Sequence, residues 1–367
     1  MNCVVLTTGG TGGHIFPALA VAEEIKRRNQ ETRVVFIGGL YGPESRLAQE
    51  AGLEFIGLSV RGVLGRGLRS IGAMLGLVRA MLSTRGKLAA IRPDVVCGFG
   101  GYAGFPAVMA AALSGIPCAL HEQNSWPGGA NRLLGKVVRK VMVSFPDENN
   151  IFPAAKTICT GNPVRRDIAV KEHAKPTGGP LRLLIFGGSL GATALNKAVV
   201  ASLPAFRQEG IELRHQTGAN DLDMVRAAYK EHGLNPDAVQ PFINDMAEAY
   251  NWADLVMCRS GATTIAELAV AAKPSILVPF PFATHDHQTA NARFLQEKGA
   301  ALLVPQSRLQ AESNGGIQEV LDLARDRARL DDMARKASAL GRPDAAACVV
   351  DELQAIAKNI SKSGRAA

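Results

Sequence analysis

Residues 9–14 (GGTGGH) combine four glycines with a histidine where a strand is expected to turn into a helix. An apolar run at 3–6 precedes them, and residues 15–25 are apolar at helical spacing before becoming charged. Glycines let a backbone approach a ligand closely, and the start of a helix presents unpaired N–H groups. The stretch therefore predicts an anion site, most typically for a phosphate. The alternative is a tight turn that binds nothing, although such a turn needs fewer glycines.

Two common ligands of such a turn are disfavoured by the residues around it. A dinucleotide site needs a carboxylate at the end of the second strand, about 20 residues on, and the run 34–37 ends instead in Gly38-Gly39. A P-loop needs Gly-Lys-Ser/Thr, and residues 13–15 read Gly-His-Ile. NAD and P-loop nucleotides are therefore poor candidates, and a sugar nucleotide stays open.

His14 lies where the expected helix begins. The positive end of a helix disfavours imidazolium, so the ring is expected to be neutral at pH 7 and suited to general-base catalysis. The alternative is a histidine that only caps or packs.

The second half of the sequence holds further candidates for anion and sugar binding. Residues 187–189 (GGS) repeat the glycine turn and add a hydroxyl. In 259–267 (RSGATTIAE), Arg259 and the helix start suit a diphosphate and Glu267 suits a ribose diol, although Thr264 and Glu267 also have capping-box spacing. Residues 285–288 (HDHQ) lack metal-ligand spacing, so a polar loop that contacts a sugar is favoured and no metal is predicted.

Charge is concentrated in the first part of this 367-residue chain, whose net charge is +8. Residues 1–160 hold 17 Lys/Arg against 10 Asp/Glu, a balance of +7, which indicates an acidic partner. The segment 61–92 has seven basic residues, no acids and many apolar residues. It predicts a patch that binds an anionic membrane surface, with a buried helix bearing a basic edge as the alternative. The segment has no aromatics for base stacking, so nucleic acid is not expected as a partner.

Composition and length indicate a globular protein of two domains. The chain is 47% hydrophobic and 20% charged. The uncharged run 95–120 is broken by glycines and prolines, so we do not expect it to span a membrane. We expect no signal peptide, and reduced thiols for the six scattered cysteines.

Strand and helix patterns alternate throughout, which predicts two doubly wound α/β domains on parallel sheets that face each other across a cleft. A linker is expected at 160–180, and a second strand–glycine–helix unit starts at 181–192. Residues 254–258 echo 94–98. The expected elements of the first half are strands 3–7, 33–37, 54–57, 94–97, 117–120 and 140–143, and helices 16–28, 43–51, 71–91, 104–114 and 129–135.

The motifs GGTGGHIFPALA, PDVVCGFGGYAGFPA, HEQN, GNPVR, GGSLGA, CRSGATTIAE and DHQTANA follow one another along nearly the whole chain. In this order they resemble the MurG family, glycosyltransferase family 28. The resemblance implies an α/β GT-B fold: two Rossmann-like, doubly wound parallel-sheet domains with a deep interdomain cleft. It implies inverting transfer of GlcNAc from UDP-GlcNAc to the 4-hydroxyl of MurNAc in undecaprenyl-pyrophosphoryl-MurNAc-pentapeptide (lipid I), which gives lipid II for peptidoglycan synthesis. The alternative is another GT-B transferase acting on a membrane glycolipid such as diacylglycerol.

The resemblance also implies how the chain is divided and where it acts. Residues 1–160 would form the acceptor and membrane domain and 161–342 the UDP-GlcNAc domain, with helix 343–360 packing across the boundary. Peripheral binding to the cytoplasmic side of the inner membrane is expected, without a cofactor.

Carried over by matching motifs, the site has three parts. His14 is the expected base, with Glu122 of the HEQN motif as the alternative. Gly100, Gly101 and Tyr102 would contact the acceptor. Ile243 would line the uracil pocket and Gln288 or its neighbour Thr289 would contact the GlcNAc. The full set of expected donor contacts is Thr11, Gly12, Gly13, Asn124, Arg165, Ser189, Ile243, Arg259, Ala262, Thr263, Thr264, Glu267 and Gln288.

Overall fold

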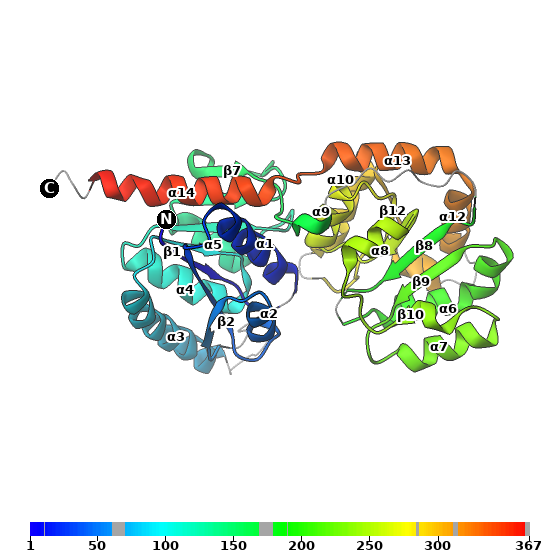
Figure 1. Ribbon diagram of the computed structural model, residues 1–367, viewed down its shortest axis with the longest axis horizontal. Helices are drawn as coiled ribbons and strands as arrows, with labels where there is room; N and C mark the ends of the chain where they lie inside the picture. Colours follow the sequence, from blue (N-terminus) through cyan, green and yellow to red (C-terminus); the bar gives the residue numbers. More distant parts are fainter. Residues whose placement is uncertain are drawn as a thin grey trace. The chain divides into compact units, whose positions relative to one another are not determined.

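The computed structural model describes residues 1–10, 12–60, 70–168, 179–188, 190–283, 286–310 and 315–363, without the side chains of 70–75, 310 and 359–363. Thr11, Ser189 and His285 of the predicted motifs lie outside the described residues, as do 61–69 of the basic segment and 169–178 of the expected linker. Contacts within the chain define two compact units: unit 1 is Met1–Arg165 with Arg342–Ala367, and unit 2 is Arg166–Gly341 (Figure 1). Each unit is built around its own parallel sheet.

Unit 1 contains a seven-stranded sheet with the order β3-β2-β1-β4-β5-β6-β7, and every neighbouring pair is parallel. Its central strands are short apolar runs buried on both faces, as parallel strands between two helix layers must be. Along β1, Val4 and Leu6 face one hydrophobic cluster, whereas Cys3 and Val5 face the other. The strands are β1 (Cys3–Thr7), β2 (Arg33–Gly39), β3 (Glu54–Leu58), β4 (Val95–Gly98), β5 (Cys118–Glu122), β6 (Lys140–Val143) and β7 (Thr157–Cys159).

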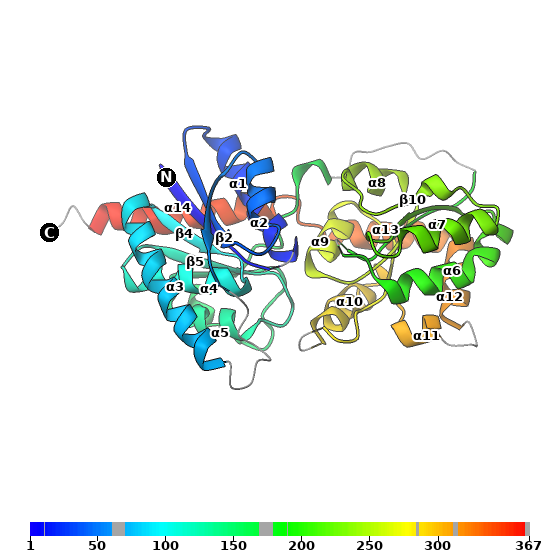
Figure 2. The ribbon, with the colours of Figure 1, turned by 90° about the horizontal axis from the view of Figure 1, so that it is seen from below.

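Helices cover both faces of this sheet. Helices α1, α2 and α14 contribute to the cluster that contains Val4, and α3, α4 and α5 contribute to the cluster that contains Val5. Figure 2 shows α3 lying beside α4, and α4 in turn contacts α5. The helices are α1 (Gly12–Arg28), α2 (Glu44–Glu50), α3 (Ser70–Ile91), α4 (Gly101–Leu113), α5 (Gly129–Val137), the short 3₁₀ helix η2 (Ala154–Lys156) and α14 (Ala345–Ser363).

Helix α14 belongs to unit 1 although it follows the whole of unit 2 in the chain, and it runs alongside α1 in Figure 1. Its apolar face, which includes Leu353, joins the hydrophobic cluster around α1. Two ion pairs add to this packing: Arg28 Nη1 lies 2.5 Å from Asp351 Oδ1, and Lys140 Nζ lies 2.9 Å from Glu352 Oε2.

Unit 2 contains a six-stranded parallel sheet with the order β10-β9-β8-β11-β12-β13. Its strands are β8 (Arg182–Phe186), β9 (Glu212–Gln216), β10 (Val239–Gln240), β11 (Leu255–Cys258), β12 (Ser275–Leu277) and β13 (Ala301–Leu303). Its helices are η3 (Arg166–Ile168), α6 (Thr193–Gln208), α7 (Leu222–Glu231), η4 (Pro236–Ala238), α8 (Met246–Trp252), α9 (Ala262–Val270), α10 (His287–Glu297), α11 (Gln306–Gln310), α12 (Gly315–Arg325) and α13 (Arg327–Leu340).

The two units repeat one strand order, because β1 lies between β2 and β4 as β8 lies between β9 and β11. An aspartate directly before β4 in unit 1, and before β11 in unit 2, binds the start of the neighbouring strand, β1 or β8. Asp94 Oδ2 accepts the backbone N–H of Cys3 at 3.0 Å, and Asp254 Oδ2 accepts that of Arg182 at 3.0 Å. The predicted α/β architecture, with two similar doubly wound parallel sheets, is therefore confirmed.

Within residues 1–160, for which each element was predicted, the sequence pattern missed one strand and placed two helix starts too late. The edge strand β7 is short and largely exposed, so it lacks a buried apolar run. Helices α1 and α4 begin four and three residues earlier than predicted, and each carries a proline at its sixth position, Pro17 and Pro106. Glycine and proline usually mark the outside of a helix, whereas both helices here begin within a glycine-rich turn.

Candidate functional site

The predicted glycine-rich turn of unit 1 connects β1 to α1 and packs against the turn that connects β4 to α4. A Cβ on Gly101 would lie 1.7 Å from the carbonyl oxygen of Gly9, and a Cβ on Gly9 would lie 2.7 Å from the nitrogen of Ala103. Gly100 and Gly101 have φ angles of +85° and +78°, which L side chains rarely adopt. The fold itself therefore requires several of these glycines, whatever ligand the turn binds.

A buried carboxylate already occupies part of the turn between β1 and α1. The backbone N–H of Gly10 donates to Glu44 Oε1 at 2.8 Å, and Glu44 is fully buried at the first residue of α2. Tyr102, a predicted acceptor contact, lies against Gly10, and the pKa of its phenol is raised by burial and by the charge of Glu44. A negative charge at Gly10 disfavours a second anion there. The protein's own carboxylate thus fills part of the predicted anion site.

His14 lies in the first turn of α1, half-buried, with its ring against Gly100. Its Nδ1 is 2.6 Å from Oε1 of Gln123, just after β5. The amide nitrogen of Gln123 donates to Nδ1 of His121 at 3.0 Å, and Nε2 of His121 is 3.0 Å from the carbonyl oxygen of Gly161. Burial lowers the pKa of His121 to about 4, so this ring is neutral at pH 7. The expected base is therefore joined to a buried polar series.

Glu122, the alternative base, is buried at the end of β5 and accepts hydrogen bonds from the loop that follows. Its carboxylate accepts the backbone N–H of Asn124 at 3.0 Å, that of Gly128 at 3.3 Å, and the side-chain amide of Asn131 at 2.7 Å. The side chain of Asn124 adds a fourth bond at 3.2 Å. This arrangement favours a carboxylate that shapes the loop, and it leaves His14 as the stronger candidate for the base.

Residues 160–164, at the start of the expected linker, are buried and belong to unit 1. Neither amide atom of Asn162 has a hydrogen-bond partner among the described residues, and the same holds for Nε of Arg165. The guanidinium of Arg165 lies 5.6 Å from the centre of the Phe16 ring, which belongs to α1. Buried polar groups normally have partners, so these atoms fit the predicted contact between Arg165 and a ligand.

In unit 2 the glycine turn connects β8 to α6, although Ser189 itself lies outside the described residues. Gly188 and Gly191 have φ angles of +92° and +78°. A Cβ on Gly191 would lie 2.0 Å from the carbonyl oxygen of Thr217, whereas no neighbour among the described residues would lie within 4 Å of a Cβ on Gly188. The end of the turn is thus fixed by packing, and its middle is open to a close neighbour.

The start of α9 supports the predicted anion and ribose contacts. Its N-cap is Gly261, a residue with no side chain to cap the first N–H groups. Thr264 is the third residue of the helix, so the capping box with Glu267 suggested by the spacing is not formed. Glu267 instead accepts a hydrogen bond from the hydroxyl of Tyr250 at 2.9 Å, in a buried position. Thr263 and Ala262 lie in the first turn, near the helix N-terminus that suits an anion.

Arg259 has several hydrogen-bond partners within unit 2. Its guanidinium is buried and donates to the carbonyl oxygens of Val278 and Pro279 at 3.1 and 3.0 Å and to Oε1 of Gln306 at 2.7 Å. It also lies 5.5 Å from the ring centre of Phe280. These contacts tie Arg259 to the loop after β12, and its contact with a diphosphate stays a prediction. Burial lowers the pKa of the guanidinium.

Gln288 and Thr289, between which the sequence left the sugar contact open, lie in the first turn of α10. Oε1 of Gln288 accepts the backbone N–H of Phe280 at 2.9 Å, so the side chain faces the loop after β12. The hydroxyl of Thr289 donates to Oδ1 of Asp286 at 2.6 Å, a local bond at the helix start. Ile243 is half-buried in the loop between β10 and α8.

Over the ranges that the structure describes, no helix is both long and apolar enough to cross a bilayer. The same ranges contain no cluster of three His, Cys, Asp or Glu side chains that would hold a metal ion.

Comparison with known proteins decides the family. The model of the glycosyltransferase family 28 N-terminal domain matches residues 4–143, and that of the C-terminal domain matches residues 182–349. The chain belongs to glycosyltransferase family 28. A relative from Nitratidesulfovibrio vulgaris (strain Miyazaki F) is 54% identical over 97% of each chain, and one from Solidesulfovibrio magneticus is 48% identical over 97% of this chain and 98% of its own. Both are named UDP-N-acetylglucosamine–N-acetylmuramyl-(pentapeptide) pyrophosphoryl-undecaprenol N-acetylglucosamine transferase.

Solved structures agree with this family 28 assignment. MurG of Acinetobacter baumannii has a TM-score of 0.78 and 37% identity, over 96% of this chain and 99% of its own. The calicheamicin glycosyltransferase CalG4 has a TM-score of 0.66 at 17% identity, over 98% and 99% of the two chains, which shows the fold alone. The predicted GT-B fold and the resemblance to the MurG family are confirmed, and the chain is a glycosyltransferase.

Sequence reasoning missed several residues at the site of this family 28 chain. His121 and Gln123 lie within the HEQN motif but received no role, because their contacts with His14 depend on β5 and α1 lying together. Glu44 lies 34 residues from Gly10 and carried no motif signal. Asn162 lies in the GNPVR motif, but only its burial in the structure identifies it as a candidate site residue.

Proposed function

We propose that this chain transfers GlcNAc from UDP-GlcNAc to the 4-hydroxyl of MurNAc in undecaprenyl-pyrophosphoryl-MurNAc-pentapeptide, with inversion at the anomeric carbon, and so forms lipid II for peptidoglycan synthesis. The observation that carries the proposal is the 54% identity, over nearly the full length of both chains, to a relative named for this transfer. The half-buried His14 at a helix start supports it chemically, because a neutral imidazole suits removal of a hydroxyl proton near pH 7.

Within this proposal each unit has a separate task. Unit 1 holds the acceptor near His14 and the turn at residues 100–102, and unit 2 holds most of the UDP-GlcNAc. The N-terminus of α9 and the glycine turn at Gly188 suit the diphosphate, because helix starts and glycine turns favour anions, and a carboxylate such as Glu267 suits the ribose. The unpartnered Nε of Arg165 suits a further contact with the donor.

In the proposed reaction, His14 removes the proton of the 4-hydroxyl while that oxygen attacks the anomeric carbon. The bond from the anomeric carbon to the diphosphate breaks, and UDP leaves with the bonding electron pair. Negative charge then grows on the diphosphate, where helix N-termini stabilise it most effectively. General-base catalysis contributes on the order of 10²- to 10⁴-fold.

The proposal also includes a membrane-binding surface on unit 1, at the cytoplasmic face of the inner membrane. Large apolar side chains are exposed on three neighbouring helices: Val78 and Leu82 on α3, Leu113 at the end of α4, and Leu133 and Val137 on α5. We call these five residues the apolar patch. Exposed basic residues lie on the same helices: Arg79, Arg85, Arg132 and Lys136.

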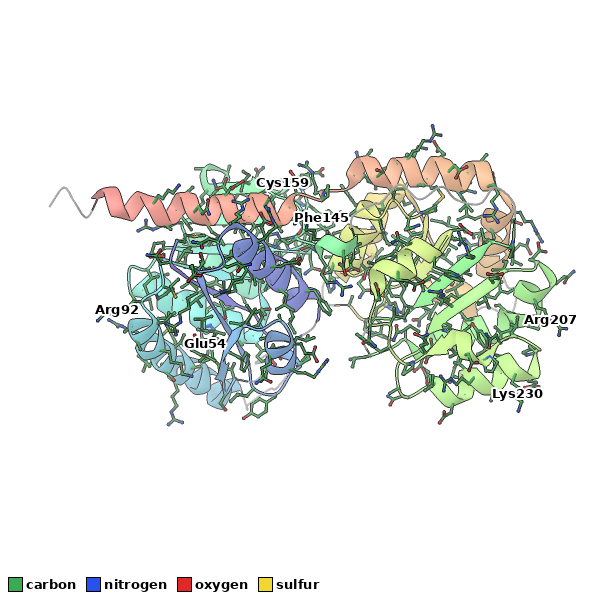
Figure 3. The ribbon with its side chains drawn as sticks, viewed as in Figure 1. Glu54, Arg92, Phe145, Cys159, Arg207 and Lys230 are labelled. Atoms are coloured by element: carbon green, nitrogen blue, oxygen red, sulfur yellow. The ribbon has the colours of Figure 1, made fainter. Side chains whose placement is uncertain are left out.

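Arg92 lies one residue after α3, and Figure 3 shows its side chain pointing away from unit 1. Exposed apolar side chains on helices that also carry exposed basic residues suit anionic lipid head groups. The predicted patch at 61–92 is supported here by its described part alone, together with α4 and α5.

The experiment that tests the function measures UDP release from UDP-GlcNAc by the purified full chain, with and without a soluble lipid I analogue. We expect release that depends on the analogue and that diacylglycerol does not replace. Release with diacylglycerol alone would support the alternative glycolipid transferase. Binding of UDP-GlcNAc without acceptor-dependent release would instead indicate a sugar-nucleotide-binding protein.

Replacement of His14 separates its two candidate roles. His14→Ala is expected to lower kcat by roughly 10²- to 10⁴-fold while the affinity for UDP-GlcNAc scarcely changes. An equal loss of donor affinity would make His14 a structural cap of the turn.

A further inference from the structure

His14, Gln123, His121 and the carbonyl group of Gly161 form a series of hydrogen bonds. The acceptor at Gly161 determines which atom donates in each of them. The carbonyl oxygen of Gly161 can only accept, so Nε2 of His121, 3.0 Å away, must carry a proton. His121 is completely buried, and burial lowers its pKa to about 4, so at pH 7 the ring has one proton only. Nδ1 of His121 is therefore an acceptor.

The side-chain amide of Gln123 has only one orientation that fits this acceptor. Its nitrogen lies 3.0 Å from Nδ1 of His121 and 3.1 Å from the carbonyl oxygen of the same residue, and it donates one proton to each. A flipped amide would put an oxygen against two acceptors, in a site where Gln123 is almost fully buried. Both N–H groups are thus used, and Oε1 faces His14.

An amide oxygen cannot donate, so the 2.6 Å contact between Oε1 of Gln123 and His14 requires a proton on Nδ1 of His14. We propose that Gln123 and His121 are positioning residues that hold the neutral ring of His14 with its proton on Nδ1 and its lone pair on Nε2. Nε2 is then the atom that takes the proton of the acceptor hydroxyl. The role of Nε2 in taking up the acceptor's proton rests on the proposed function. The assignment of the tautomer does not depend on that function.

The same series explains where the proton stays during the reaction. When Nε2 takes up a proton, the imidazolium keeps its bond from Nδ1 to Oε1 of the Gln123 side chain, and the amide dipole stabilises the positive charge. The proton cannot pass on to His121, because the amide between the two rings has no proton to relay from its oxygen to its nitrogen. The other charged groups on neighbouring elements are Glu122 on β5, Glu44 on α2, and Arg165.

Nitrogen-15 NMR of the full chain, labelled at histidine, tests the tautomer without any substrate. We expect His14 to show a protonated Nδ1 and an unprotonated Nε2 at neutral pH, with assignment from a His14→Asn sample. We expect Gln123→Leu, which removes the acceptor, to turn this into a mixture of tautomers. Gln49→Leu, an exposed glutamine on α2, is the matched control and should leave the spectrum unchanged. A proton on Nε2 in the unaltered chain would overturn the proposal, and this measurement does not depend on whether a variant folds.

Kinetics then test the positioning role. Gln123→Leu should lower kcat roughly 10- to 100-fold, a part of what general-base catalysis supplies, with KM for UDP-GlcNAc unchanged. A Gln123→Leu variant that folds and keeps its kcat would contradict the positioning role. If the tautomer is as expected and no acceptor supports UDP release, the proposed function fails and the tautomer assignment stands.

Discussion

Glu44 accepts the backbone N–H of Gly10 at 2.8 Å, although 34 residues separate the two in the chain. The carboxylate is fully buried, and its Oε2 has no hydrogen-bond partner among the described residues. A buried carboxyl group loses its hydration, and the N–H group of the turn partly compensates for that loss. Glu44 therefore fixes the turn between β1 and α1, and with it the start of the helix that carries His14.

Replacement of Glu44 should show this role in stability. Glu44→Ala leaves the N–H of Gly10 without its acceptor and is expected to lower the free energy of unfolding by about 1–3 kcal/mol. Glu44→Gln keeps an acceptor without the charge and should fold more stably than Glu44→Ala. Urea unfolding of both variants checks the order, and a Glu44→Ala chain as stable as the parent would show that the contact does not fix the turn.

The two glycine turns of unit 1 are in close contact, so alanine should destabilise the fold by different amounts at two glycines of similar φ. Gly101 and Gly115 have φ angles of +78° and +72°, but a Cβ would strike the backbone of Gly9 only at Gly101. Both alanine variants carry the left-handed strain of about 1–2 kcal/mol. Gly101→Ala should cost at least about 2 kcal/mol more than Gly115→Ala in urea unfolding, because the turns must move apart. Equal costs would mean that the turns separate easily.

Local patterns were sufficient to predict most of the fold, because apolar runs, glycine turns and helical spacing act over a few residues. Strand β1 was predicted at its observed bounds, and the echo between 94–98 and 254–258 correctly indicated two similar sheets. The helix starts of α1 and α4 were placed late because Pro17 and Pro106 lie inside the helices. The edge strand β7 is too exposed to show an apolar run.

The site was harder to predict, because its contacts join distant parts of the chain. The motifs named His14, but nothing local shows that Gln123 orients its ring or that Gly161 sets the direction of the series. Arg259 matched an anion contact by its position before a helix, and nothing in the sequence indicated that its Nη1 would donate to carbonyl groups of the loop after β12. Spacing shows which residues share an element and leaves open which groups meet in space.

Glu267 provides a test of donor binding in unit 2. Hydrogen bonds to a charged group contribute about 1.5–3 kcal/mol, so Glu267→Gln is expected to raise KM for UDP-GlcNAc roughly 10- to 150-fold with a smaller change in kcat. Glu248→Gln, at an exposed glutamate paired with Arg214 on the same unit, is the control and should leave KM unchanged. Steady-state kinetics at varied UDP-GlcNAc concentration measure this KM. An unchanged KM would mean that Glu267 does not contact the donor.

The apolar patch on unit 1 predicts binding to anionic vesicles. Leu82 and Leu133 are 61% and 49% exposed, and burial of a leucine in lipid contributes about 1.5–3 kcal/mol. Leu82→Glu combined with Leu133→Glu should therefore weaken sedimentation with phosphatidylglycerol vesicles more than tenfold. Met224→Glu, an exposed apolar position on unit 2, should not. Equal loss in both variants would mean that added charge alone, and not the patch, controls the binding.

Buried histidines predict how stability depends on pH. Burial lowers the pKa of His215 to about 3, and this ring sits between Asn196 and Tyr229 in the core of unit 2. Because the pKa in the unfolded chain is about 6.5, the unfolded state binds the extra proton as the pH falls from there toward 3. Stability is therefore fully present above pH 6.5 and is lost below it, at about 1.4 kcal/mol per pH unit for this histidine. Urea unfolding at pH 7, 6 and 5 should show a smaller slope for His215→Gln than for the parent. His232→Gln, at a position without this burial, should keep the parental slope, and a His215→Gln slope equal to the parent's would contradict the assignment.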